Sequence, residues 1–92
     1  MSESVHVECA RAGDRWTCEV TVGTDAAATR HRLTVDQDLL GRLRPGTEDP
    51  IELVRDSFAF MLAREPREAI LREFDLQVIG RYFPEWEGEI AR

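Results

Sequence analysis

Four side chains belong to types that bind metals or undergo redox chemistry: His6, Cys9, Cys18 and His31. Two thiolates and two imidazoles form a set that tetrahedral zinc accepts. The spacing argues against zinc, because the cysteines are too far apart in the sequence for the tight C-x₂₋₄-C arrangement. The strand-like alternation also places Cys9, Cys18 and His31 on one face and His6 on the other. The sequence therefore predicts no metal site and no cofactor.

The relation between the two cysteines depends on the turn that joins their strands. A two-residue turn at 12–13 places Cys9 opposite Trp16, so that the two cysteines are diagonal neighbours. A four-residue turn at 12–15 places Cys9 opposite Cys18, where a disulfide becomes possible. Alternation does not choose between these registers. We expect free, buried thiols, because cysteine is among the most buried residue types and the cytoplasm is reducing.

His31 is the ionisable side chain of the apolar sheet face, and burial there perturbs the pKa of an imidazole. It is therefore the candidate ligand-binding or pH-sensitive residue. Motifs for catalysis are absent from the sequence: there is no phosphate-binding loop, no H-E-x-x-H and no G-x-S-x-G. Ser57 lies inside a predicted helix with no histidine at helical spacing, so we interpret it as structural. The chain is not expected to be an enzyme.

Alternating apolar and polar residues over 5–9, 16–22 and 31–35 predict three antiparallel strands with one apolar and one polar face. Helical patterns follow from residue 36 onward. The predicted fold class is α+β, an N-terminal three-stranded antiparallel sheet with one face covered by C-terminal helices. We expect a single domain, 1–92, with strands at about 4–35 and helices at about 36–91.

The helical part divides at its prolines and at its capping residues. Short helices are predicted over 36–43, over 67–74 after Pro66, over 76–83 with Asp75 as the cap, and after Pro84. The longest helix is predicted to run from about Pro50 to Arg64, with Asp49 as its cap.

That longest helix carries apolar residues on two faces. One stripe is suited to cover the sheet and consists of Ile51, Val54, Phe58, Met61 and Leu62. Leu53 and Phe60 lie on the opposite side, where either the following helices or a second copy of the protein must cover them. Aromatic residues that stay exposed in the following segment would suit a partner protein. The candidate partner-binding residues are Leu53, Phe60, Tyr82, Phe83 and Trp86.

The net charge is −6, with no lysine. Most of it lies in residues 47–92, which hold six arginines and eleven acids. Such a field repels phosphate backbones, so nucleic-acid binding through Arg15, Arg30 and Arg32 on the polar sheet face is the weakest hypothesis. No apolar run is long enough to span a bilayer, and no signal sequence opens the chain, so we expect a cytoplasmic protein with no membrane partner.

The stretch SFAFMLAREPREAILREFDLQVIGRYFPEW, at 57–86, resembles the C-terminal segment of short bacterial proteins of uncharacterised function. The resemblance implies a small bacterial protein and no activity. The leading hypothesis is a protein-interaction module, with a homodimer as one form. The alternative is a small-molecule-binding domain whose pocket lies between sheet and helices near His31.

Overall fold

A computed structural model describes residues 4–91. Three long strands form an antiparallel meander, β1 (Val5–Ala12), β2 (Arg15–Val22) and β3 (Thr29–Asp36). A short fourth strand, β4 (Glu73–Asp75), joins the far side of β3 in parallel. The α+β class is confirmed, but the prediction of a three-stranded, purely antiparallel sheet is wrong, because the sheet is mixed and has the order β1-β2-β3-β4.

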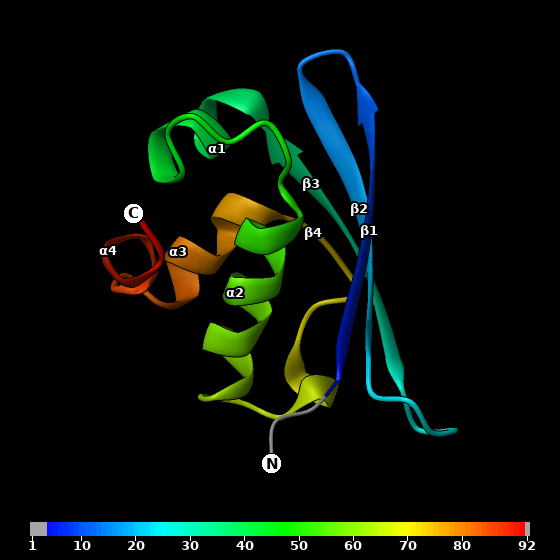
Figure 1. Cartoon of the computed structure of the whole chain (residues 1–92). Coiled ribbons are helices and arrows are strands. Elements are labelled where there is room, and N and C mark those ends of the chain that lie inside the picture. Colours follow the sequence, from blue (N-terminus) through cyan, green and yellow to red (C-terminus); the bar gives the residue numbers. More distant parts are fainter. Residues whose placement is uncertain (1–3, 92) are drawn as a thin grey trace.

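The alternation along the strands sorts the side chains onto the two faces as the pattern predicts. Cys18, Val20 and Leu33 are buried on one face, whereas Glu19 and Arg32 are exposed on the other. All the helices lie on the apolar side of the sheet (Figure 1). None of the described helices covers the opposite face, as expected for an antiparallel meander covered on one side.

The chain between β3 and β4 forms α1 (Gln37–Leu43) and α2 (Ile51–Leu62). The Asp49 carboxylate accepts a hydrogen bond from the Ile51 backbone N–H at 2.9 Å, which satisfies one of the free donors at the start of α2. The predicted helix at 50–64 is therefore confirmed to within one residue at its start and two at its end, but its N-cap is Pro50 and not the predicted Asp49. Helix α2 packs closest to β1 in the sheet (Figure 1).

The second apolar face of α2 is covered by the chain's own C-terminal part. There the chain forms two short helices, α3 (Ile79–Tyr82) and α4 (Trp86–Ile90). Phe60 meets Phe83 edge to face at 5.7 Å between ring centroids, and Trp86 Nε1 donates to Ser57 Oγ at 3.2 Å. Of the two coverings that the sequence left open, the structure has the intramolecular one.

The segment 67–75 is the main departure from the predicted elements. The expected helix over 67–74 is wrong: only Arg67–Ala69 turns, as the 3-10 helix η1, and the chain then extends into β4. The Arg32 backbone N–H donates to the Arg72 carbonyl at 2.7 Å, so this extended segment satisfies a donor at the edge of β3. A second 3-10 turn, η2 (Leu76–Val78), follows and is capped by Asp75, as predicted.

Candidate functional site

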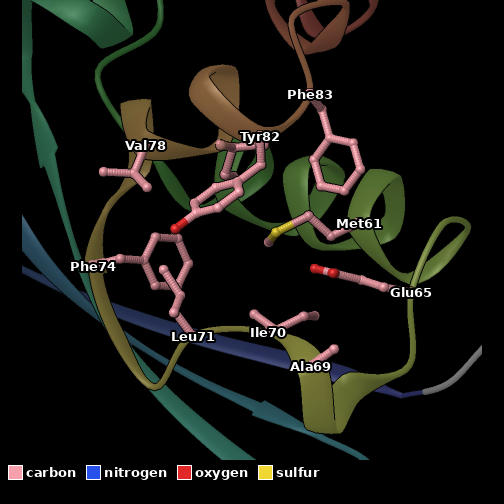
Figure 2. Close-up of a pocket in the computed structure, with 10 residues that line it drawn as sticks. Met61, Glu65, Ala69, Ile70, Leu71, Phe74, Val78, Tyr82 and Phe83 are labelled. Atoms are coloured by element: carbon pink, nitrogen blue, oxygen red, sulfur yellow. The ribbon is translucent and has the colours of Figure 1, made fainter.

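An apolar pocket of about 270 Å³ opens beside the C-terminal part of α2. Its other walls come from the extended segment after η1, from η2 and from α3 (Figure 2). Ten residues line it: Met61, Glu65, Ala69, Ile70, Leu71, Phe74, Val78, Ile79, Tyr82 and Phe83. The departure from helical structure at 70–75 shapes this pocket, because the extended chain places Ile70, Leu71 and Phe74 in its wall and leaves Arg72 and Glu73 exposed.

Two large apolar side chains stand at the pocket's rim. Tyr82 is 66% exposed and Leu71 is 45% exposed, and among the described residues they are the exposed large hydrophobic side chains. Figure 2 shows the Tyr82 ring reaching across toward Phe74, with Leu71 beneath. The floor of the pocket, by contrast, is formed by side chains that are buried in the core, namely Met61, Ile70 and Ile79. The pocket thus combines a buried apolar floor with an exposed apolar rim.

Among residues 4–91, Glu65 is the only charged residue that lines the pocket. It follows α2 and is half-buried, and its side chain points toward Met61 and Ile70 (Figure 2). No side-chain hydrogen bond or ion pair joins its carboxylate to another residue within 4–91. The pocket therefore combines an apolar wall with one acceptor group.

His31 does not line this apolar pocket; it lines a separate, polar hollow of about 480 Å³ together with Arg32 and Arg72. Its Nδ1 is 2.7 Å from the Leu71 carbonyl oxygen, which can only accept, so Nδ1 carries the proton. Thr29 Oγ1 then donates to Nε2 at 2.9 Å, and Phe58 packs edge to face against the ring. Burial lowers the pKa of His31 below its ordinary 6.5, and the charge of Arg72 lowers this pKa further, although the Leu71 hydrogen bond opposes the shift. The neutral imidazole of His31 thus donates a hydrogen bond to the Leu71 carbonyl, which fixes the backbone of Leu71 at the rim of the pocket.

Acidification is expected to destabilise the fold through His31. Because the pKa of its imidazole is lower in the folded chain than in the unfolded one, stability is full above about pH 6.5 and falls as the pH decreases below it. The slope from one such group does not exceed about 1.4 kcal/mol per pH unit. The measurement is the free energy of unfolding in urea between pH 7.5 and 5.

The control is His31→Gln, whose amide can donate to Leu71 and accept from Thr29 without titrating. All other titrating groups are common to the two proteins, so the difference between their pH curves reports His31. Parallel curves for the wild type and the variant would contradict the prediction.

The structure divides the five predicted partner-binding residues into two groups. Leu53, Phe60 and Trp86 are buried within the chain's own core, so their side chains are not available to a partner. Tyr82 and Phe83 line the pocket. Sequence reasoning missed Leu71 and Glu65, the first because a helix was expected there and the second because a single glutamate carries no pattern.

Cys9 and Cys18 are directly opposite each other and joined in a disulfide. The expectation of free thiols is therefore wrong. Gly13 has a positive φ of 66°, so that Gly13 and Asp14 form the tight loop that aligns the cysteines. Within the described part of the chain, no three His, Cys, Asp or Glu side chains come together as metal ligands.

Two of the three arginines predicted on the polar sheet face, Arg15 and Arg32, are paired with acids, whereas Arg30 is exposed and forms no ion pair within 4–91. Arg32 Nη2 lies 2.9 Å from Glu19 Oε1, and Arg15 Nε lies 3.2 Å from Asp36 Oδ1. The face therefore alternates positive and negative charge and offers no continuous basic surface of the kind that tracks a phosphate backbone.

Comparison with known proteins adds no function to this description. No family model, curated protein or solved structure matches the chain. Among residues 4–91, no helix has both the length and the apolar character needed to cross a bilayer.

Proposed function

We propose that this chain is a protein-interaction module that receives an apolar side chain of a partner in the pocket between α2, the 70–74 segment and α3. The observation that carries the proposal is the coincidence of an apolar hollow with the exposed Leu71 and Tyr82 at its rim. Exposed apolar groups that gather at one site mark an interaction surface, whereas single scattered ones do not.

The exposed apolar rim of the pocket favours a protein partner over a small molecule. Small-molecule sites usually enclose roughly 300–1,000 Å³ and cover most of the ligand. This pocket has about 270 Å³, and its apolar surface continues outward onto Tyr82. A side chain anchored in the hollow, with its backbone crossing the rim, uses both features.

Selection from a displayed heptapeptide library tests the proposal. The central residue of the library is fixed as Leu, Phe or Trp, and the other positions are random. The wild type is expected to enrich a defined motif, whereas Ala69→Phe is expected to weaken binding of the enriched peptides at least tenfold. Ala69 is exposed and lines the pocket, so a phenylalanine there fills the hollow without entering the core.

Ala26→Phe is the matched control, since Ala26 is exposed in the loop between β2 and β3, outside the pocket lining. It is expected to bind the peptides as the wild type does. Melting temperatures of both variants verify that each is folded. Failure to enrich any motif, or equal binding by Ala69→Phe, would overturn the proposal.

A further inference from the structure

We infer that the partner segment carries a basic residue, Arg or Lys, next to the apolar side chain that enters the pocket. The inference rests on the proposed function and specifies the chemistry of the partner. It starts from Glu65, the one charged group in an otherwise uncharged lining.

A half-buried carboxylate beside Met61 and Ile70 loses part of its hydration without gaining a partner from the described chain. A cation brought by a ligand would restore that interaction as a charge-assisted hydrogen bond, which is stronger than a neutral one. Apolar walls limit screening by water, so the gain is larger here than at an open surface.

Arg64, which precedes Glu65, already interacts with other groups of the chain. Arg64 Nη1 donates to the Phe60 carbonyl at 2.9 Å, and its guanidinium lies 3.5 Å from the centre of the Phe60 ring. The same guanidinium pairs with Glu89 at 3.1 Å and with Glu85 at 3.5 Å.

Nearby Glu68 also has its own arginine. Its Oε2 lies 3.3 Å from Arg67 Nε. Glu65 thus differs from these neighbouring acids, Glu68, Glu85 and Glu89, in having its carboxylate turned into the pocket without a cation.

The overall charge also favours a basic partner over a second copy of this chain. Residues 47–92, which contain the whole pocket lining, hold eleven acids against six arginines. Two such surfaces repel each other, whereas a basic segment is attracted and steered toward the site. Salt screens this long-range contribution, but it screens the contact inside the pocket less.

The test compares peptide pairs in a double-mutant cycle. The heptapeptide most enriched by the wild type is synthesised with its basic residue and with glutamine in that place. Both peptides are titrated against the wild type, Glu65→Gln and Glu48→Gln. Glu48 is exposed and lies outside the pocket lining, so its variant removes the same charge without altering the pocket.

The wild type and Glu48→Gln are expected to prefer the basic peptide about three- to tenfold, and Glu65→Gln is expected to lose that preference. Binding of the glutamine peptide should be nearly equal for all three proteins. Enriched peptides without Arg or Lys, or a basic preference that survives in Glu65→Gln, would overturn the inference and leave the proposed function standing. An absence of any pocket-dependent peptide would instead overturn the proposed function.

Sedimentation equilibrium of the chain alone tests whether a second copy of the protein occupies the pocket. A monomer at 100 µM is expected. A dimer that Ala69→Phe dissociates would show that a second copy occupies the pocket, and would overturn the inference of a basic partner.

Discussion

Replacement of Trp86 with alanine is expected to lower the free energy of unfolding by about 3–5 kcal/mol. Trp86 is fully buried, and its indole N–H is bonded to Ser57 in the middle of α2. Removing the indole leaves a cavity between α2 and α4 and leaves the Ser57 hydroxyl without its donor. Urea unfolding followed by far-ultraviolet circular dichroism measures the change.

Two further variants separate the contributions. Trp86→Phe keeps most of the ring volume and loses the hydrogen bond, so a loss of about 1–2 kcal/mol is expected. Tyr82→Ala removes an exposed ring at the pocket rim and should change stability by less than about 1 kcal/mol. If Trp86→Ala were no more destabilising than Tyr82→Ala, the packing of α4 against α2 would be contradicted.

Reduction of the Cys9–Cys18 disulfide is expected to lower the free energy of unfolding by about 2–3 kcal/mol. The bond joins residues separated by 9 positions, and a loop of that length restricts the unfolded chain by about this amount. The measurement is urea unfolding with and without a phosphine reductant.

The double variant Cys9→Ala/Cys18→Ala supplies the control, because its unfolding should not respond to the reductant. Equal stability of the reduced and oxidised wild type would contradict the prediction. The bond also bears on location, since disulfides persist mainly in oxidising compartments. A cytoplasmic location therefore remains a proposal, and it requires that this disulfide resist the glutathione pool.

The strand pattern predicted which residues are buried in β1, β2 and β3, because the period of two reports the side-chain direction directly. It did not predict the register, since both registers bury the same face. The deciding information lay in the turn. The hairpin loop consists of Gly13 and Asp14, and its first residue has a positive φ. Glycine adopts a positive φ readily, whereas an alanine such as Ala12 does not, so the loop starts at Gly13.

The failure at 67–74 has a different cause. The residues there favour a helix locally, but the backbone N–H of Arg32 needs an acceptor, and Arg72 provides it across forty positions of sequence. Long-range pairing of this kind leaves no local periodicity and overrides propensity.

The incorrect helix prediction over 67–74 also explains why the sequence did not predict the pocket. Leu71 becomes a rim residue only when the segment is extended, and Tyr82 and Phe83 alone, of the five candidate partner-binding residues, reach the pocket. The helix with two apolar faces implied exposure of Leu53 and Phe60, and the dense aromatic segment after it implied exposure of Trp86. Burial of Leu53 and Phe60 depends on how short helices fold back, which the spacing of prolines suggests but does not determine.

All ten residues of the pocket lie within 61–83, and none comes from the β1–β2 hairpin. In the proposed function, the part of the chain that would recognise a partner is therefore largely separate from the β1–β3 meander, although Phe74 of β4 belongs to both the pocket and the sheet. Substitutions at Ala69, Leu71, Val78 and Tyr82, which are not buried, can alter recognition while Ile70 and Ile79 keep the core intact. Sequence changes confined to the exposed pocket residues within 61–83 would therefore change which partner is bound, while the sheet and the core keep their structure.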